Sequence, residues 1–319
     1  MIKTTPRDVG APEAESPPLR VDVLCVGHAS YDLVFTIPHH PAPDEKLFAD
    51  ALLNCGGGPA ANAAVTVARL GHRAAFAGYL GNDPFGDLHA AELAAEGVEL
   101  RCLARGDAPT PVSFVLVKPD GSRALVCHKG ATAILEPEAV DLAALDPRVL
   151  LFDGHEPRLS EALLERAVPK VLDAGSLHAG TEALMSRVDY LVCSEKFARQ
   201  WLGEDHPEQA GERLAEIAPA VVITLGEQGL IWRKSGETGR LPAFPVRPVD
   251  TTGAGDALHG AFAAGLAAGL EWLDLLRYAS AAGAACCEVL GARPGMPDTA
   301  RLSRWYPVTH SPCESFPCA

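Results

Sequence analysis

Short apolar runs alternate along the chain with segments of helical periodicity, and this alternation constrains the fold more than any other feature. Runs such as 149–152 and 220–225 are rich in Val, Leu and Ile, as expected of strands buried on both faces. The full set of predicted strands is 21–27, 74–78, 149–152, 170–172, 190–192 and 220–225, and that of predicted helices is 60–70, 88–96, 159–167, 196–202, 211–217 and 257–269. The pattern predicts a mostly parallel sheet with helices on both faces.

Two segments, 35–50 and 98–130, interrupt this alternation. In the second, apolar runs at 112–117 and 124–127 flank Lys118-Pro119-Asp120-Gly121, and Asp-Gly between such runs is a hairpin signal. These segments predict a small β excursion at one edge of the main sheet. At the ends of the chain, we expect a disordered leader over 1–20 and a tail over 301–319, which leaves one domain over 21–300.

Charge and cysteine usage exclude several classes of protein. The net charge of −14 argues against non-specific binding to nucleic acid or to anionic membranes, since both require positive surface potential. No stretch approaches the roughly 18 apolar residues of a membrane span. The nine cysteines are scattered without a CxxC pair, which predicts reduced thiols in a cytoplasmic protein. Only Cys313 and Cys318, in the tail, are candidates for oxidation.

The sharpest motif is the run from Val249 to Ala257, directly before a predicted helix. Gly253, Ala254 and Gly255 carry almost no side chain, so successive backbone N–H groups can approach a ligand. A helix N-terminus also offers free N–H donors and a positive dipole end, which suit a γ-phosphate. Asp256 is then either a helix cap or a general base that faces an incoming hydroxyl.

A second glycine run precedes the first predicted helix. Gly57 and Gly58 permit close approach of the backbone to a ligand, and Asn62 can both donate to and accept from sugar hydroxyls. The alternative is that the glycines serve tight packing and that Asn62 is solvated. Asp32 follows the first strand, at the carboxyl edge where open α/β sheets bind their ligands.

Together these motifs resemble the PfkB (ribokinase-like) carbohydrate kinases over residues 21–300. The spacing of Gly57-Gly58, Asn62, Gly71 and Gly81 is similar to that family's first signature, and Asp250 to Asp256 is similar to its second. The resemblance implies a three-layer α/β/α fold with a mostly parallel central sheet. It also implies a small β-sheet lid, formed by 35–50 and 98–130, that often makes a homodimer contact.

The resemblance further implies an ATP- and Mg²⁺-dependent kinase that transfers the γ-phosphoryl group to a hydroxymethyl group of a sugar. Asp256 would be the base, and the amides of Gly253, Ala254 and Gly255 would hold the transferring charge. The residues implied for the sugar are Asp32, Lys46, Gly57, Gly58 and Asn62; those for ATP are Thr224, Gly226 and Gly229; and those for a monovalent cation, K⁺, are Asp250 and Thr252.

One stretch departs from the family pattern. Many relatives have an Asn-x-x-Glu pair that orders the Mg²⁺–phosphate water shell, where this chain has Ser194-Glu195-Lys196-Phe197. Ketohexokinase and sulfofructose kinase look similar in this stretch, so a ketose is the expected acceptor. Lys46 falls where sulfofructose kinase has a basic residue for its anionic substrate, whereas Gly154-His155 stands where an Arg would be expected.

Two alternatives stay open. A nucleoside kinase of the same superfamily would need aromatic side chains near the lid to stack on a base, and 98–130 offers only Phe114. A non-catalytic protein that binds a sugar or a nucleotide would have no need of Asp256 beside an anion pocket. A panel of sugar and nucleoside acceptors distinguishes these functions.

Overall fold

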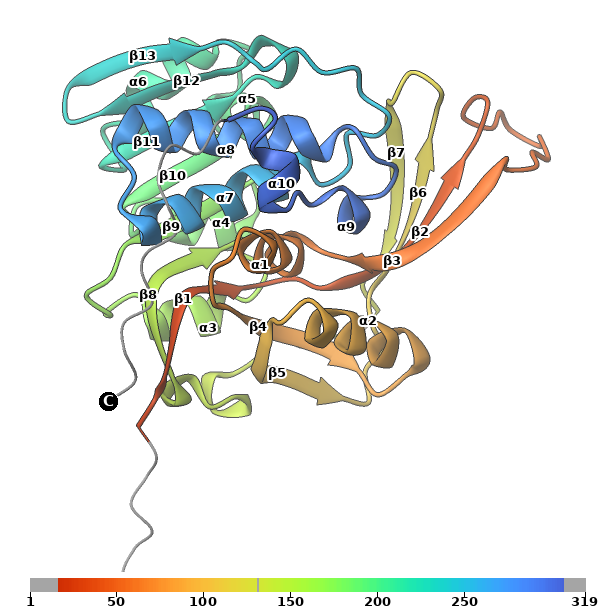
Figure 1. The fold of residues 1–319 in the computed structure, drawn as a ribbon, viewed down its shortest axis with the longest axis horizontal. Helices are drawn as coiled ribbons and strands as arrows, with labels where there is room; N and C mark the ends of the chain where they lie inside the picture. Colours follow the sequence, from red (N-terminus) through yellow and green to blue (C-terminus); the bar gives the residue numbers. More distant parts are fainter. Residues whose placement is uncertain (1–16, 131, 307–319) are drawn as a thin grey trace, which may run out of the picture.

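The computed structural model describes residues 17–130 and 132–306, and a nine-stranded sheet lies at its centre (Figure 1). Its strands, in spatial order, are β13 (Glu237–Leu241), β12 (Leu230–Lys234), β11 (Ala220–Thr224), β10 (Tyr190–Ser194), β9 (Lys170–Ala174), β8 (Leu145–Phe152), β1 (Leu19–Val26), β4 (Ala74–Gly81) and β5 (Glu99–Gly106). The strands from β11 to β5 are all parallel, and β12 and β13 add an antiparallel hairpin at one edge. The predicted mostly parallel sheet is therefore confirmed.

Helices cover both faces of this sheet. One face carries α1 (Pro59–Arg69), α2 (Pro84–Ala95), α7 (Ala254–Ala268) and α8 (Trp272–Cys286), and the other carries α3 (Pro157–Leu163), α4 (Ala179–Leu184), α5 (Glu195–Leu202) and α6 (Pro207–Leu214). The short helices α9 (Ala292–Gly295) and α10 (Thr299–Leu302) follow α8, and 3₁₀ turns span Pro137–Ala139, Leu142–Ala144 and Gly226–Gln228. The predicted three-layer arrangement is confirmed.

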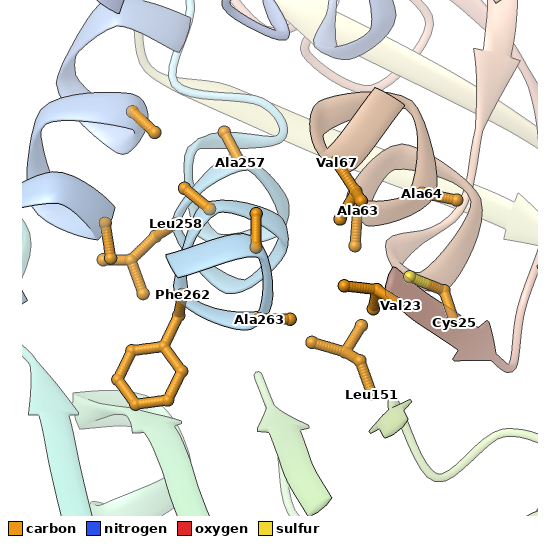
Figure 2. Packing of buried hydrophobic residues seen from close by; sticks show 14 of the residues in the cluster. Val23, Cys25, Ala63, Ala64, Val67, Leu151, Ala257, Leu258, Phe262 and Ala263 are labelled. Carbon is orange, nitrogen blue, oxygen red and sulfur yellow. The ribbon is translucent and has the colours of Figure 1, made fainter. Parts of the chain in front are cut away.

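Successive residues of β1 face opposite sides of the large sheet, and each side has its own hydrophobic core. Val23 and Cys25 face the core under α1 and α7, whereas Leu24 and Val26 face the opposite core. In the first core, small alanines of α1 and α7 let the two helices approach closely over the sheet, whereas the Phe262 ring of α7 points away from α1 (Figure 2). Because α7 is apolar nearly all round, it lies buried, and its N-terminus is held rigidly at one edge of the sheet.

A separate four-stranded sheet lies beside the main domain. Its order is β3 (Ala51–Gly57), β2 (Ser30–Thr36), β6 (Val112–Val117) and β7 (Arg123–His128). The predicted hairpin is confirmed, because β6 and β7 pair antiparallel around the Asp-Gly turn. One face of the sheet packs inward through Val34, Cys55, Val115 and Val117.

The lid boundaries predicted from the sequence require correction. Within 98–130, β5 pairs with β4 and belongs to the large sheet, so only β6 and β7 contribute to the small one. Within 35–50, the chain mainly connects β2 to β3, and the pairing residues flank it at Ser30–Thr36 and Ala51–Gly57. The sequences of β2 and β3 mix polar and apolar residues, so these two strands do not stand out as apolar runs.

The predicted boundaries at the ends of the domain also shift. β1 already begins at Leu19, while residues 1–16 lie outside the described residues. The predicted tail is wrong for 301–306, because Leu302 is buried on the core and Trp305 packs edge-on against Phe244 with ring centroids 6.1 Å apart. Residues 307–319, with Cys313 and Cys318, lie outside the described part of the chain.

Within 17–130 and 132–306, none of the helices combines the length and the apolar character that crossing a bilayer requires.

Candidate active site

A buried carboxylate fixes the conformation of the loop before α7. Asp250 is fully buried, and its Oδ1 accepts hydrogen bonds from the backbone N–H of Thr252 at 2.8 Å and from the Thr252 hydroxyl at 2.6 Å. Its Oδ2 accepts from the N–H of Gly291 at 2.8 Å. The side chains of Asp250 and Thr252 therefore fix the shape of the loop, and a monovalent cation at these two residues stays a prediction.

The two glycines of this loop have different surroundings. Gly253, the residue before α7, has φ of 79°, and a Cβ there would lie 2.6 Å from the Met296 Cε and 2.7 Å from the Ala292 Cβ. A Cβ at Gly255 would meet no heavy atom within 4 Å. Gly253 is thus required by the turn, whereas Gly255 borders open space beside the N–H groups of the first helical turn.

Asp256 stands in the first turn of α7 and meets Asn62 of α1. The Nδ2 of Asn62 donates to the Asp256 Oδ2 at 2.7 Å. Burial raises the pKa of Asp256, and the hydrogen bond from Asn62 opposes this shift. The structure brings together these two predicted residues, which lie 194 positions apart in the sequence.

Asp32 and the glycine run meet where β2 pairs with β3. Asp32 is 5% exposed on β2 and accepts at Oδ1 from the Ser30 hydroxyl at 2.9 Å. Burial raises the pKa of Asp32 to about 6, against hydrogen bonds from Ser30 and Ser113. A Cβ at Gly57 would lie 2.2 Å from the Asp32 Oδ2, and Gly58 has φ of 92°, so both glycines are needed here. Asn62 follows them within the first turn of α1.

Lys46 lies elsewhere. It is exposed in the connection between β2 and β3, and its Nζ sits 5.3 Å from the centroid of the Phe48 ring. Within the described residues, no hydrogen bond or ion pair joins its side chain to Asp32, Asn62 or Asp256. Its predicted contact with the acceptor stays a prediction.

The residues predicted for ATP gather at the carboxyl end of β11. Thr224 ends that strand, and its hydroxyl donates to the Cys193 carbonyl at 3.4 Å. Gly226 and Gly229 both have positive φ, of 57° and 89°, and bracket a 3₁₀ turn. A Cβ at Gly226 would meet nothing within 4 Å, so this turn leaves room for a ligand, whereas Gly229 packs against the Leu241 carbonyl.

The stretch that departs from the family pattern has a structural role. Ser194 is the N-cap of α5, and its Oγ accepts from the N–H of Phe197 at 3.0 Å. The same hydroxyl donates to the Gly175 carbonyl at 2.9 Å.

The sequence alone assigns no role to two charged groups near Asp256, which are Asp153 and Arg123. Asp153, directly after β8, accepts from the backbone N–H groups of His28 at 2.7 Å, Ala60 at 3.2 Å and His155 at 2.8 Å. It therefore ties the end of β1 to the start of α1. Arg123 of β7 donates to the Thr251 hydroxyl at 2.9 Å, so the small sheet touches the loop before α7. Asp153 directly follows the predicted strand 149–152 and Arg123 directly precedes the apolar run 124–127, and these positions were the available signal.

His259 of α7 and Asp173 of β9 form a buried pair close to the start of α7. The Nδ1 of His259 lies 2.6 Å from the Gly255 carbonyl and 3.3 Å from the Asp173 Oδ2, and its Nε2 lies 3.0 Å from the Val192 carbonyl. Both residues are buried, and burial raises the pKa of Asp173. The pair fixes the backbone of the turn that carries Asp256.

The comparisons with known proteins agree with this arrangement. The model of the pfkB family carbohydrate kinases matches residues 21–299. The ribokinase of Bacillus subtilis is 29% identical over 86% of this chain and 96% of that protein. The structure of the ribokinase of Arabidopsis thaliana, complexed with ribose and ATP, is 27% identical and superimposes with a TM-score of 0.77 over 90% of this chain and 99% of that one.

Two further relatives are a nucleoside kinase and a fructokinase. A nucleoside kinase of Methanothermobacter thermautotrophicus is 26% identical over 87% of this chain and 93% of that protein. Fructokinase-1 of Zea mays is 28% identical over 80% of this chain and 89% of that protein. The family match over 21–299, together with the ribokinase-like fold, shows that the chain belongs to the pfkB family of carbohydrate kinases and is a phosphotransferase with an alcohol group as acceptor.

Proposed function

We propose that this enzyme transfers the γ-phosphoryl group of ATP to a hydroxymethyl group of a sugar, specifically a ketose. The observation that carries the proposal is the position of Asp256, hydrogen-bonded to Asn62 and next to the open space beside Gly255. A carboxylate at a helix N-terminus opposes anion binding, so its place here fits a base that faces the acceptor hydroxyl.

The chemistry follows from this geometry. Asp256 takes the proton of the acceptor hydroxyl while the acceptor oxygen bonds to the γ-phosphorus and the bond from that phosphorus to the bridging oxygen breaks, which leaves ADP. The backbone N–H groups of Gly253, Ala254 and Gly255 stabilise the charge on the transferring group. Asp32 and Asn62, with the backbone at Gly57 and Gly58, hold the sugar hydroxyls.

Mg²⁺ belongs to this proposal as a partner of the nucleotide. Mg²⁺ is usually held by substrate phosphates, waters and one or two carboxylates, and it neutralises phosphate charge. The open space beside Gly255 leaves room for a hydrated cation that enters with ATP. The side chains of Asp250 and Thr252, proposed for K⁺, hydrogen-bond to each other.

A coupled assay of ADP release over a panel of acceptors tests the proposal. The panel contains fructose, an anionic ketose such as sulfofructose, ribose, deoxyribose and adenosine. We expect the largest kcat/KM for a ketose. A higher value for adenosine would favour the nucleoside kinase, which the Methanothermobacter relative keeps as the second candidate. No ADP release with any acceptor would contradict the proposed reaction altogether.

We also propose that the enzyme is a homodimer through the outer face of the small sheet. Leu52, Phe114 and Val126 are 57%, 43% and 65% exposed, and Phe114 stacks on Phe35 with ring centroids 6.3 Å apart. Phe114 pairs directly with Val126 across β6 and β7, so the apolar side chains form one continuous surface. An exposed apolar surface of this kind on a sheet favours association with a second copy.

Phe114→Glu is expected to convert the dimer to a monomer, because it places a charge at the centre of this face. Light scattering after size-exclusion chromatography measures the mass. Leu273→Glu, at an exposed position of α8, is the matched control and should leave the mass unchanged. A wild-type protein that is monomeric at micromolar concentration would rule out this interface.

We further propose a cytoplasmic location. All seven cysteines among the described residues are free thiols, and six of them are buried. Burial raises the pKa of several of them, including Cys25 and Cys193. The buried cysteines therefore act as small apolar side chains in the core. Thiols of this kind are typical of proteins in the reducing cytoplasm.

A further inference from the structure

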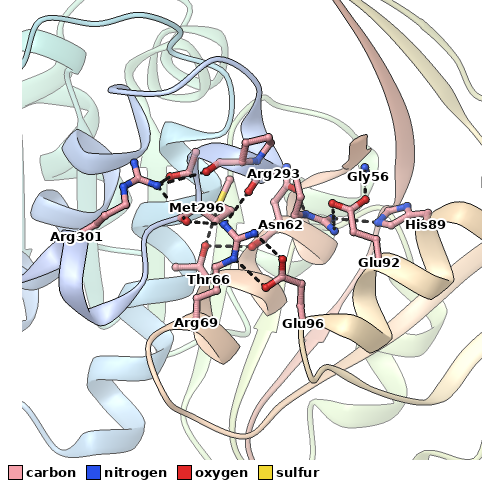
Figure 3. A network of polar contacts seen from close by, with 12 residues as sticks. Gly56, Asn62, Thr66, Arg69, His89, Glu92, Glu96, Arg293, Met296 and Arg301 are labelled. Carbon is pink, nitrogen blue, oxygen red and sulfur yellow. Dashed lines mark hydrogen bonds and ion pairs between the residues drawn. The ribbon is translucent and has the colours of Figure 1, made fainter. Parts of the chain in front are cut away.

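Arg293 is a buried arginine whose side chain reaches the acceptor side of the site. It lies in α9 and is 1% exposed. Its Nε donates to the Asn62 Oδ1 at 3.2 Å, its Nη2 lies 3.0 Å from the His89 Nε2, and its Nη1 lies 3.5 Å from the Glu92 Oε1 (Figure 3). Burial of a guanidinium is costly unless its contacts compensate.

The contacts of Arg293 determine how the amide of Asn62 is turned. A guanidinium only donates hydrogen bonds, so the atom of Asn62 that faces it must be the carbonyl Oδ1. The NH₂ group then faces the other way, where its Nδ2 lies 2.7 Å from the Asp256 Oδ2. An ionised carboxylate only accepts, so the two neighbours require the same orientation of the amide independently.

Other residues already hold α9 in place. Arg69 of α1 donates to the carbonyls of Arg293 at 3.0 Å and Met296 at 2.7 Å, and it forms an ion pair with Glu96. Arg301 donates to the Gly295 carbonyl at 3.1 Å. Both act on the backbone of 293–296 (Figure 3). The Arg293 side chain adds its contacts with Asn62, His89 and Glu92 to these.

The far end of the Arg293 side chain connects to the small sheet. The Glu92 Oε2 accepts from the backbone N–H of Gly56 at 2.7 Å, while its Oε1 faces Arg293. Gly56 belongs to β3 and directly precedes Gly57 and Gly58. The chain of contacts therefore runs from the small sheet through Glu92, Arg293 and Asn62 to the proposed base.

We propose that Arg293 is a positioning residue whose guanidinium holds the side-chain amide of Asn62 with its NH₂ group directed at Asp256. The catalytic consequence rests on the proposed function, in which Asp256 is the base. The positioning itself is a property of the unliganded protein and can be measured without an acceptor.

Loss of the bond from Asn62 is expected to raise the pKa of Asp256, since this bond favours the ionised form. The other groups near the Asp256 carboxylate remain in place in the variants described next; they are Asp32 on β2, Arg123 on β7, Asp153 after β8, Asp173 on β9, His259 on α7 and Cys286 on α8. Each double variant removes one positive and one negative charge, so a difference in pKa between them reports on Asn62.

The test compares two double variants that each remove one Arg–Glu pair. Arg293→Met with Glu92→Gln removes the contact to Asn62, and Arg69→Met with Glu96→Gln removes the neighbouring pair that does not contact the Asn62 amide. Removing both members of a pair avoids an unpaired buried charge. The Asp256 carboxyl carbon is followed by ¹³C NMR through a pH titration, and its signal is the one missing in Asp256→Asn.

We expect the first variant to raise the pKa of Asp256 by about one pH unit. With an acceptor found in the panel, the acid limb of the kcat profile should move by the same amount, while KM changes less than about threefold. The Arg69 variant should move neither. Equal pKa values in the two double variants would overturn the proposal.

Asn62→Ala tests the premise of the proposal separately, namely that the Asn62 amide lowers the pKa of Asp256. It leaves Arg293 in place and removes the donor directly, so it should raise the pKa of Asp256 by a similar amount. An unchanged pKa in this variant would also overturn the proposal. The NMR result stands even if no acceptor is phosphorylated, so failure of the proposed function is distinguishable from failure of the positioning role.

Discussion

Asp256→Asn is expected to lower kcat by about 10²- to 10⁴-fold, the range typical for loss of a positioned general base. Asparagine cannot take the proton from the acceptor hydroxyl, whereas it keeps the size of the side chain. ATP and acceptor binding should change little, because the sugar is held by Asp32, Asn62 and the backbone of Gly57 and Gly58 in the proposed complex. Steady-state ADP release with the best acceptor of the panel measures the effect.

Stability provides the control for this variant. Burial raises the pKa of Asp256, so the ionised carboxylate costs free energy in the folded state. Replacing it by a neutral amide should leave the melting temperature unchanged or raise it slightly. Turnover at the wild-type rate would remove Asp256 from the role of base, and a large fall in melting temperature would make the loss of turnover uninformative.

Gly253→Ala is expected to lower the free energy of unfolding by about 3 kcal/mol, from left-handed backbone strain together with overpacking. Gly253 has φ of 79°, and its new Cβ would lie 2.6 Å from the Met296 Cε and 2.7 Å from the Ala292 Cβ. Denaturant unfolding followed by circular dichroism measures the change.

Gly255→Ala is the matched control two residues away. Its Cβ would meet nothing within 4 Å, so the fold should be as stable as the wild type or slightly more stable. The methyl group would instead occupy the open space proposed for the transferring phosphoryl group, and kcat/KM for ATP should fall. Equal stability of the two variants would contradict the packing described around Gly253, and a fully active Gly255→Ala would contradict the proposed position of the phosphoryl group.

The parts of the fold that the sequence predicts are those with a single strong signal. The buried strands are nearly continuous apolar runs, and the start of α7 combines glycines with an apolar helix. The hairpin of β12 and β13 was missed because Leu230 to Leu241 mixes charged and apolar residues around a Ser235-Gly236 turn. Helix α8 was missed because its alanines give no clear apolar stripe.

The residues of the candidate site likewise differ in how well the sequence predicts them. Asp256 and Asn62 stand in recognisable motifs, and the structure brings them together. Nothing in the local sequence indicates that Arg293 is buried, because an arginine between Ala292 and Pro294 is typical of an exposed loop. Its burial depends on contacts with α1 and α2, which lie about 200 residues away in the sequence. Long-range packing of this kind is not visible in local patterns.

The residues proposed for the reaction and those proposed to bind the acceptor come from different segments of the chain. The proposed base and the loop proposed to bind the phosphoryl group come from 250–256. The residues proposed to bind the acceptor sugar come from 32–62, on β2, β3 and α1. Substitutions in the first segment act on the chemistry common to every acceptor, and those in the second act on the choice of acceptor. New substrates are therefore accessible by exchanging short N-terminal stretches while the catalytic turn stays intact, provided that Asn62 keeps its two partners.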